Sequence, residues 1–409
     1  MSNKQHIIFV HSLFYPDHSA ASQILTDLAF YLADNDFKVS VITSRKMYHG
    51  NGSQLKNFEK INEVNIYRQW SLSLGKTGFI KRLIDYVSLE ISMVLKIIRF
   101  TKRYDTVIFL TDPPLLSLIA TPIILIKGAY IVNWLQDLYP EVAVSVGILA
   151  QKSLVNKILK KIRNSILNKA NMNVVIGQHM FNYLIENNVE LKKIQLIPNW
   201  ANSDDLVPVL HQDNPLREEW GLQDKFVVGY SGNLGKAHDF LTISNAIKLL
   251  QDSSNICFLF IGGGSGMDAL QNHCEEKGYK NVIFKPYQPR KFLRFSLSLS
   301  DVHWVTLEPK MESFIVPSKI YGLLATAKPI IFIGHKNGEI AHLINKASCG
   351  KIINQGDSNK LAITIVELSK DLDLVSKMGN CGREEFKKNY DFHISANKFS
   401  KLIFDFKNP

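Results

Sequence analysis

Glycine-rich turns followed by lysine are the features of this 409-residue chain best suited to chemistry. In segment 228–239 (VGYSGNLGKAHD), an apolar run leads into Gly232, Asn233 and Lys236 before a helical pattern begins. Glycines between a strand and a helix let backbone N–H groups approach a phosphate, and a lysine adds a point charge. The segment is therefore a candidate phosphate site, with a purely structural turn as the alternative.

A second candidate for the same chemistry is segment 312–321 (ESFIVPSKIY). Pro317 starts a helical pattern, so Ser318 and Lys319 place a hydroxyl and a cation at a helix N-terminus, where N–H groups lack partners. A diphosphate is well matched to such a point. A surface position for Lys319 is the alternative.

A third glycine turn, segment 261–266 (IGGGSG), contains Gly263 and Gly264 and superficially matches a dinucleotide fingerprint. That fingerprint needs an acidic residue about 20 positions later for a ribose hydroxyl. The next predicted strand ends instead in FKPY at 284–287. Nicotinamide and flavin cofactors are therefore disfavoured, and the turn is expected to lie against a base or ribose or to be only structural.

Two polar residues in the first half of the chain could act on an acceptor hydroxyl. His18 follows the first predicted strand closely, and Asp137 follows a later one. A carboxylate at a strand end is well placed as a weak general base, which favours Asp137. A helix cap for Asp137 and a solvated loop for His18 are the alternatives.

The elements that must position these residues alternate along the chain. Helical patterns lie between short runs rich in Val and Ile, which is typical of parallel sheets covered on both faces. The predicted strands are 7–11, 39–43, 65–69, 106–111, 130–135, 173–176 and 194–197, then 226–231, 256–262, 282–286, 302–306, 330–333 and 350–353. We expect an α/β protein of two Rossmann-like doubly wound domains that face each other across a cleft, with ligands bound beyond the carboxyl ends of the strands.

The domain boundary is predicted where Pro, Asn, Ser and Asp cluster, near 198–208. The domains are then 1–200 and 201–390, and a final amphipathic helix, 391–409, is expected to pack back on the first domain.

The net charge of +11 is concentrated in two segments. Segment 76–103 carries +5 and contains apolar residues at helical spacing, and segment 152–169 carries +6 without an acid. Two interpretations remain open: solvated helix faces, or a cationic surface for anionic lipid. Nucleic acid is disfavoured because no nucleic-acid-binding module is recognisable.

Compartment and membrane association follow from three further patterns. The most apolar segment, 115–126, is shorter than the ~20 residues of a membrane span, so it predicts a buried helix or a shallow membrane contact. The four cysteines are far apart, which favours reduced thiols. Without a signal-peptide core near the first residues, we expect a cytoplasmic protein, soluble or peripheral on the cytoplasmic face of the membrane.

Taken in order, these motifs resemble the retaining glycosyltransferases of family 4, which have the GT-B architecture, in the branch whose donor loop reads Pro-Ser-Lys. This branch includes transferases of exopolysaccharide, colanic-acid and O-antigen synthesis. The resembling segments, between residue 7 and about residue 353, are FYPDHSAASQILTDLAFYLA, NWLQDLYPEVA, LIPNWAN, VVGYSGNLGKAHDF, FLFIGGGSG, FKPYQPR and DVHWVTLEPKMESFIVPSKIYGLLATAKPI.

The resemblance implies an enzyme whose C-terminal domain holds a UDP- or GDP-sugar and whose N-terminal domain holds a lipid-linked or polysaccharide acceptor. It implies that Gly232, Asn233 and Lys236 face the diphosphate, that Ser318 and Lys319 close on it, and that Gly263, Gly264 and Tyr287 lie near base and ribose.

The resemblance also bears on the sugar and on metals. Glu312 matches the first glutamate of the family's Glu-x7-Glu pattern, which holds sugar hydroxyls. Ile320 replaces the second glutamate, so ribose binding must differ, with Tyr321 as the candidate. Retention without a protein nucleophile is implied. No metal is expected, because lysine, helix dipole and backbone donors can neutralise the leaving diphosphate.

Two other functions fit the same architecture. One is a nucleotide-sugar epimerase, and the other is a non-catalytic nucleotide-sugar-binding protein that lost activity with the missing glutamate.

Overall fold

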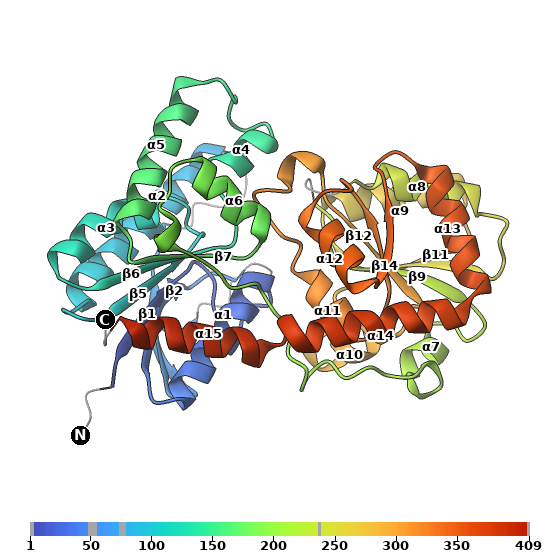
Figure 1. Ribbon diagram of the computed structural model, residues 1–409, viewed down its shortest axis with the longest axis horizontal. Helices are drawn as coiled ribbons and strands as arrows, with labels where there is room; N and C mark the ends of the chain where they lie inside the picture. The colour runs from blue at the N-terminus through green and yellow to red at the C-terminus, as the bar shows by residue number, and fades with distance from the viewer. Residues whose placement is uncertain (1–3, 48–54, 73–78, 236–238, 407–409) are drawn as a thin grey trace. The chain divides into compact units, whose positions relative to one another are not determined.

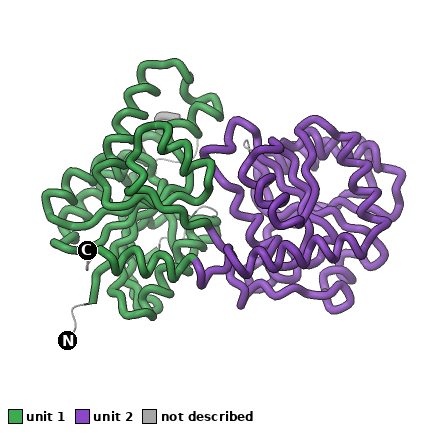
Figure 2. The backbone as a smooth tube through the Cα atoms, viewed as in Figure 1, with its two compact units in different colours: residues 1–198, 395–409 green, residues 199–394 purple. Residues whose placement is uncertain are grey.

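The computed structural model describes residues 4–47, 55–72, 79–235 and 239–406, which form two compact units (Figure 2). Unit 1 comprises Met1–Pro198 and Ser395–Pro409, and unit 2 comprises Asn199–Ile394. The sequence placed the boundary at residue 200 and the return of the chain at 391. In the structure the chain leaves unit 1 after Pro198 and re-enters it at Ser395.

Unit 1 is built, within its described residues, on an eight-stranded sheet with the order β3-β4-β2-β1-β5-β6-β7-β8 (Figure 1). Neighbouring strands are parallel except β3 and β4, which are antiparallel. The strands are β1 (His6–Val10), β2 (Lys38–Ser44), β3 (Phe58–Ile61), β4 (Val64–Gln69), β5 (Thr106–Leu110), β6 (Tyr130–Leu135), β7 (Met172–Val175) and β8 (Ile194–Leu196).

The helices of unit 1 cover both faces of this sheet. They are α1 (Ala20–Asp34), α2 (Phe79–Phe100), α3 (Leu116–Ile126), α4 (Glu141–Ser145), α5 (Leu154–Lys169), α6 (Gln178–Glu186) and α15 (Phe392–Asp405), with the 3-10 turn Leu191–Lys193. The steps from β4 to β5, to β6 and to β7 all advance in one direction across the sheet. Right-handed crossovers therefore place α2, α3 and α5 on one face, where α3 contacts both other helices (Figure 1).

The final helix packs against unit 1 through specific contacts. The ring of Phe399 lies 4.7 Å from that of Trp134 on β6, measured between centroids. The side chain of Gln5 donates a hydrogen bond of 2.9 Å to the backbone carbonyl of Ile403. The apolar pattern of the last residues thus covers the sheet formed by the first half of the chain.

Unit 2 has, among its described residues, a six-stranded, fully parallel sheet with the order β11-β10-β9-β12-β13-β14. The strands are β9 (Phe226–Asn233), β10 (Ile256–Gly263), β11 (Val282–Lys285), β12 (Val302–Thr306), β13 (Ile330–Ile333) and β14 (Gly350–Ile353). The helices are α7 (Pro215–Glu219), α8 (Leu241–Leu249), α9 (Ser265–Lys277), α10 (Leu293–Ser298), α11 (Lys319–Ala325), α12 (Glu339–Ala347), α13 (Ser358–Lys370) and α14 (Leu372–Asn389), with 3-10 turns at His211–Asp213, Arg290–Phe292 and Pro309–Met311.

Two features differ from the sequence-based prediction. Strand β3 was not predicted, because its sequence FEKI has two charged residues at its centre, and the strand lies half-exposed at the sheet edge. Helix α3 is only partly buried: Ile119 is 48% and Ile126 is 88% exposed, whereas Ala120 and Ile124 are covered. In the described part of the chain, no helix is long and apolar enough to cross a membrane, and the four cysteines are free thiols.

Candidate functional site

The glycine turns that follow β9 and β10 are packed against each other at the carboxyl edge of the unit 2 sheet. Asn233 pairs with Gly263 in the parallel register, and the N–H of Leu234 donates to the Gly263 carbonyl at 2.9 Å. Gly264 has φ +106°, and a Cβ there would collide with Oδ1 of Asn233 and lie 2.9 Å from the Leu234 carbonyl oxygen. Only glycine can adopt this positive φ and also leave room for Asn233 and the Leu234 carbonyl, so we expect no other residue to be tolerated at position 264.

Lys319 reaches the first of these turns from the start of α11. A Cβ on Gly232 would lie 3.4 Å from the Lys319 Nζ, and that Nζ lies 3.7 Å from the ring centroid of Tyr230. Within the described residues the buried Nζ has no hydrogen-bond partner. Burial lowers the pKa of Lys319 to about 7. An anion at this point would supply both the missing acceptor and the missing countercharge.

The other residues expected at this site differ in how the structure places them. Tyr287 is 46% exposed, and its Cε2 lies 3.3 Å from the position of a Cβ on Gly263. Ser318 precedes α11 as its N-cap and makes no side-chain capping bond. Lys236 falls outside the described residues.

Tyr321 is not oriented toward the glycine turns. It is 2% exposed, and its ring lies 5.2 Å from that of Tyr390. Two positions along an α-helix rotate a side chain by about 200°, so Tyr321 and Lys319 leave α11 on opposite sides. The expected contact between Tyr321 and a ribose is therefore not supported by its position.

Glu312 lies in the loop between β12 and α11, and its carboxylate reaches the N-terminus of α12. Its Oε2 accepts a hydrogen bond of 3.3 Å from the Glu339 N–H, and its buried Oε1 has no partner in the described part of the chain. Burial raises the pKa of Glu312 to about 7, opposed by the backbone N–H groups of Glu339 and His335. A carboxyl group near half-ionisation can both donate to and accept from a hydroxyl.

Asp137 lies between β6 and α4 in unit 1. Its backbone N–H and that of Gln136 donate to Oγ1 of Thr111, at 3.2 and 2.9 Å, which ties this loop to the end of β5. Burial, assisted by the charge of Asp112, raises the pKa of Asp137 to about 6. The helix-cap alternative is wrong, because α4 begins at Glu141 with Pro140 as its N-cap.

His18 is exposed, in agreement with the loop alternative. Its backbone carbonyl accepts a hydrogen bond of 2.7 Å from the side chain of Gln23. Asp17 is the buried member of this pair, with 4% exposure, and its Oδ1 accepts from the Ser19 N–H at 2.8 Å.

Sequence reasoning missed three ionisable residues of unit 1: Asp112, whose charge acts on Asp137, and two residues on which Asp112 also acts. They are His11, Asp112 and Glu90, all buried or placed at strand ends. His11 and Asp112 directly follow β1 and β5, so their positions after strands carried a signal. Glu90 lies within the basic helix α2, and no local pattern marked it.

The two basic segments contain α2 and α5; Lys102 and Arg103 follow α2, Lys152 precedes α5, and Lys76 lies outside the described residues. On α2 the covered stripe is Leu89, Met93 and Ile97. A second apolar stripe is exposed, formed by Ile84, Val87, Ile91, Leu95 and Ile98.

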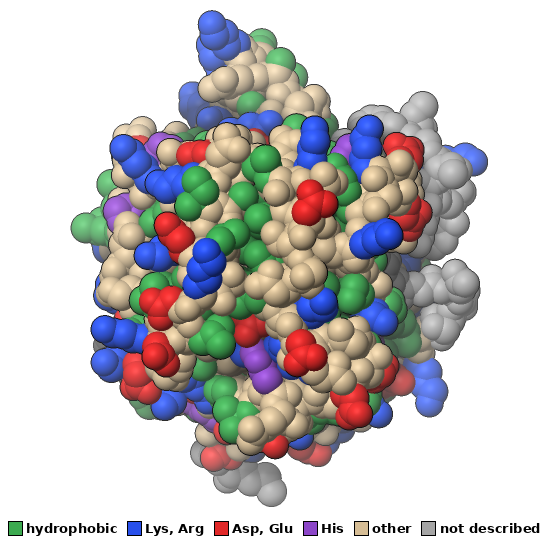
Figure 3. Space-filling model, turned by 90° about the vertical axis from the view of Figure 1, so that its right-hand side faces the viewer, with side chains coloured by type: hydrophobic (Ala, Val, Ile, Leu, Met, Phe, Trp, Pro, Cys, Tyr) green, Lys and Arg blue, Asp and Glu red, His purple; other side chains and the backbone are tan. Residues whose placement is uncertain are grey.

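On α5 an exposed apolar stripe, Leu154, Val155, Ile158 and Ile162, lies beside the exposed Lys157 and Lys161. Arg163 does not contribute to a cationic surface, because it is buried and its Nη2 lies 2.8 Å from Oε1 of Glu141. On the face of the molecule in Figure 3, by contrast, basic and acidic side chains are interspersed.

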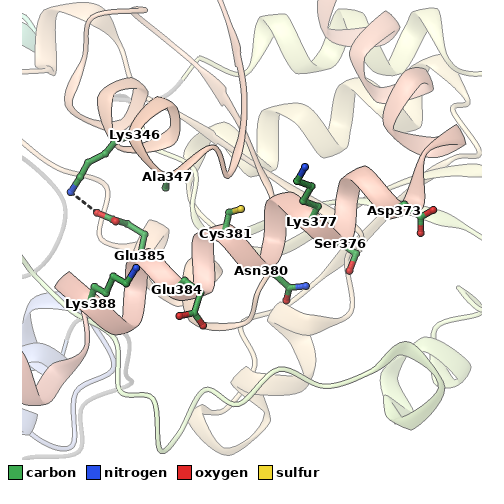
Figure 4. Close-up of a pocket in the computed structure, with 10 residues that line it drawn as sticks. All are labelled: Lys346, Ala347, Asp373, Ser376, Lys377, Asn380, Cys381, Glu384, Glu385 and Lys388. Atoms are coloured by element: carbon green, nitrogen blue, oxygen red, sulfur yellow. Dashed lines mark hydrogen bonds and ion pairs between the residues drawn. The ribbon is translucent and has the colours of Figure 1, made fainter.

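A shallow hollow of about 670 Å³ lies along α14 in unit 2 (Figure 4). Its lining includes Lys377, Cys381 and Glu385, and Glu385 forms an ion pair of 2.8 Å with Lys346. These charges are exposed or paired within the protein. The hollow therefore lacks the buried unpaired group that marks the Lys319 site. In the described residues, no three His, Cys, Asp or Glu side chains are grouped to hold a metal ion.

Comparison with known proteins identifies the family. Residues 212–385 match the family described as "Glycosyl transferases group 1". The "Probable glycosyltransferase WbjE" of Pseudomonas aeruginosa is 31% identical over 314 residues, covering 76% of each chain. The chain belongs to the group 1 glycosyltransferases. A second relative, the "Putative colanic acid biosynthesis glycosyl transferase WcaI" of Escherichia coli (strain K12), is 27% identical over 53% of this glycosyltransferase and 54% of the relative.

Solved structures confirm the predicted fold class of this glycosyltransferase. Sucrose-phosphate synthase of Thermosynechococcus elongatus superposes with a TM-score of 0.76 at 15% identity, covering 99% of this chain and 100% of the other. HepE of Anabaena in complex with UDP and glucose gives a TM-score of 0.74 at 15% identity, covering 98% and 100%. The enzyme thus has the two parallel-sheet α/β domains of the GT-B fold.

Proposed function

We propose that this enzyme is a retaining, family 4 glycosyltransferase of the branch with a Pro-Ser-Lys donor loop. Unit 2 binds a UDP- or GDP-sugar, and unit 1 binds a lipid-linked or polysaccharide acceptor for cell-surface polysaccharide synthesis. Two relatives support this proposal: WcaI is named for colanic acid biosynthesis, and HepE was solved with UDP-glucose.

The buried ammonium of Lys319, which has no hydrogen-bond partner in the described residues, carries the proposal together with the Gly232 turn beside it. An unpaired cation away from water is costly, and proteins keep one where a ligand completes the site. The diphosphate of a nucleotide sugar supplies oxygens for Lys319 and for the N–H groups of the glycine turns. We assign Ser318 and Lys236 to the same group.

We assign fewer protein contacts to the base, the ribose and the transferred sugar of the donor than to its diphosphate. Gly263, Gly264 and Tyr287 border the base and ribose, since Tyr287 is exposed beside Gly263. Glu312 holds hydroxyls of the transferred sugar through its unpartnered Oε1. Ile320 is fully buried, so no residue at that position takes the ribose.

The transfer uses an acceptor hydroxyl and a leaving diphosphate. The bond between the anomeric carbon and the diphosphate oxygen breaks, and the acceptor oxygen bonds to that carbon on the same face. Asp137 takes the hydroxyl proton, and Lys319 stabilises the charge on the leaving group. No divalent ion is needed in this scheme, so chelation by EDTA is expected to leave the rate unchanged.

The helix face formed by α2, α3 and α5 is proposed to bind the cytoplasmic face of an anionic membrane, where a lipid-linked acceptor is found. The exposed apolar stripe on α5 lies beside exposed lysines, the helix that carries the α2 stripe also carries the exposed Lys81 and Arg99, and Ile126 of α3 is 88% exposed. Apolar side chains can enter the head-group region while lysines contact anionic lipid.

Thermal unfolding with UDP and with GDP tests the donor site. A nucleotide at 100 times its dissociation constant adds ~2.7 kcal/mol to the free energy of unfolding. We expect this for one of the two nucleotides with the wild type and with Lys377→Ala, which alters the hollow on α14. Lys319→Ala should abolish the shift, and an unchanged shift would exclude the proposed phosphate site.

Product analysis with a labelled nucleotide sugar separates the three candidate functions. Transfer of label to a polysaccharide or lipid fraction supports the proposal. An epimerised donor without an acceptor supports the epimerase, and binding without any product supports the non-catalytic protein.

Vesicle co-sedimentation across a salt series tests the membrane proposal. Binding to anionic vesicles should weaken as salt rises. It should also weaken in a Lys157→Glu, Lys161→Glu double variant, but not in a Lys248→Glu control on α8 of unit 2. Equal binding of all three proteins, or none to anionic vesicles, would contradict it.

A further inference from the structure

His11 directly follows β1, and within the described residues one of its ring nitrogens is hydrogen-bonded and the other is not. It is 4% exposed, and its Nδ1 lies 2.8 Å from the backbone carbonyl oxygen of Asp112. A carbonyl oxygen only accepts, so Nδ1 carries the proton and Nε2 presents a lone pair. The Nε2 atom is buried and has no hydrogen-bond partner among residues that the structure describes.

The charges that act electrostatically on His11 are both carboxylates from the loops after β1 and β5, whereas the cation Arg45 directly follows β2 on the other side of β1. Asp112 follows β5, the immediate neighbour of β1, and Asp17 lies in the loop after β1; both carboxylates act electrostatically on His11. Burial outweighs them and lowers the pKa of His11, so the imidazole is neutral at neutral pH.

The same Asp112 connects His11 to the remaining acids of this edge. Its charge acts on Asp137 after β6 and on Glu90 of α2, and with Asp137 it also acts on Tyr139. Burial raises the pKa of Glu90 and raises that of Tyr139 to about 12. The charged neighbours that affect these groups are therefore acids, and their oxygens, like Nε2 of His11, accept hydrogen bonds.

We propose that His11, Asp112 and Asp137 form the binding site for an uncharged, hydroxyl-rich sugar unit of the acceptor, with His11 Nε2 accepting a hydrogen bond from one of its hydroxyls. A sugar offers many O–H donors, which match this set of acceptors. A uronic acid or a phosphosugar would bring a further negative charge beside Asp112 and Asp137, whose carboxylates repel it. This inference rests on the proposed function, since it specifies the acceptor.

The contribution of His11 differs from that of Asp137. Asp137 is the base that takes a proton, whereas His11 holds an acceptor hydroxyl in place. Loss of one such hydrogen bond, with a buried group left unpaired, corresponds to about tenfold weaker binding.

Saturation-transfer difference NMR on the full-length protein tests the site without a donor. The probes are methyl α-glucoside, which is uncharged, and glucuronate, which carries a carboxylate. We expect signal from methyl α-glucoside and little from glucuronate. Equal signals, or none from methyl α-glucoside, would overturn the proposal.

Variants then locate the binding at His11. His11→Phe keeps the ring shape and removes Nε2, so it should lose about tenfold in affinity for methyl α-glucoside, and His11→Gln should recover part of it through its amide oxygen. The matched control is His6→Phe at the amino end of β1, where Nε2 is already bonded to Oγ of Ser40 at 3.0 Å and Nδ1 lies 3.2 Å from Oδ1 of Asp105. Unchanged affinity in His11→Phe would exclude His11.

A spectroscopic measurement separates a binding role from a structural one. In the ¹⁵N spectrum of ring-labelled protein, methyl α-glucoside should shift the Nε2 resonance of His11 and leave those of His6 unchanged. A shift absent from His11 would contradict the proposal. Failure of this inference is distinguishable from failure of the donor assignment, because UDP or GDP binding and its loss in Lys319→Ala are measured without any sugar probe and on a residue of unit 2.

Discussion

The aromatic ring of Tyr230 supports the ammonium group of Lys319, whose Nζ lies 3.7 Å from the ring centroid. The Tyr230 hydroxyl donates a hydrogen bond of 2.8 Å to the backbone carbonyl of Asn233. One side chain of β9 therefore holds both the cation and the glycine turn that we assign to the diphosphate. The cation–π contact offsets only part of the cost of burying Lys319.

Lys319→Met should stabilise the protein without nucleotide and abolish UDP or GDP binding. The folded protein has a Lys319 pKa of about 7, against an ordinary value of 10.5. Burial of the charged ammonium therefore destabilises the folded protein by its full amount below pH 7, and this cost disappears as the pH rises to 10.5. We expect a gain of about 1–3 kcal/mol at pH 7 that shrinks toward pH 10. Urea unfolding at several pH values measures it, and a gain independent of pH would argue against an unpaired charge.

Gly264→Ala and Gly278→Ala form a matched pair at the two ends of α9. Both glycines have positive φ, +106° and +69°, but a Cβ at Gly278 meets no atom within 4 Å. Gly278→Ala should cost only about 1 kcal/mol of stability and keep nucleotide affinity. Gly264→Ala must displace Asn233 and should lose both. Calorimetric titration with UDP or GDP measures the affinity of each variant. Equal affinities would show that the Gly264 turn does not contribute to nucleotide binding.

Glu312→Gln should stabilise the protein at high pH, whereas Lys319→Met stabilises it at low pH. The pKa of Glu312 is raised from 4.5 to about 7 in the folded protein. The protonated side chain is therefore tolerated below pH 4.5, and the free energy of unfolding falls as the pH rises from 4.5 through 7. The variant should match the wild type at pH 4.5 and be about 1–2 kcal/mol more stable at pH 8. Thermal unfolding across this range is the measurement. A difference that is largest at low pH would contradict the burial of an ionisable carboxyl group.

The local sequence predicted strands well where both faces are covered. The bounds of β12 agree with the predicted 302–306, because all its residues are buried and its sequence VHWVT is rich in the β-branched and aromatic residues that strands favour. Burial of a stripe was less predictable. On α2 the periodicity shows two apolar stripes, but only tertiary packing decides that Met93 is covered and Leu95 is 58% exposed.

The candidate sites show the same difference between features set by local sequence and features set by tertiary packing. Gly232 and Lys319 were found because turn glycines and a helix-start lysine carry their chemistry in short motifs. The role of His11 depends on the carbonyl of Asp112, 101 positions away, and on β1 and β5 being neighbours in the sheet. No local pattern contains that contact. Arg163 shows the reverse error, since a lysine-rich segment gives no sign that one of its cations is buried.

Arg163→Met should destabilise unit 1 far more than Lys157→Met. Arg163 and Glu141 are 7% and 2% exposed. Arg163→Met leaves the buried Glu141 carboxylate with the Tyr183 hydroxyl at 2.8 Å and the Lys160 Nζ at 3.5 Å as partners, so losing the charged hydrogen bonds of Arg163 should cost about 1.5–3 kcal/mol. Lys157 is exposed, and its replacement should cost less than about 0.5 kcal/mol. Urea unfolding compares the two variants. Adding Glu141→Gln to Arg163→Met should recover part of the loss, because it removes the carboxylate charge that lost its arginine. No recovery would show that Tyr183 and Lys160 already compensate that charge.

Asp137→Asn should remove the acidic limb of the pH–rate profile and lower kcat by about 10²–10⁴-fold. A base must be ionised to take a proton, and the Asp137 pKa of about 6 places half of it in the carboxylate form near pH 6. The wild-type rate should therefore rise with pH through this value and level off above it. Asp105→Asn, at the amino end of β5, is the control, and its profile should keep the same midpoint. A wild-type rate that is flat between pH 5 and 7, or an unchanged midpoint in Asp137→Asn, would assign the proton transfer to another group, such as the leaving diphosphate itself.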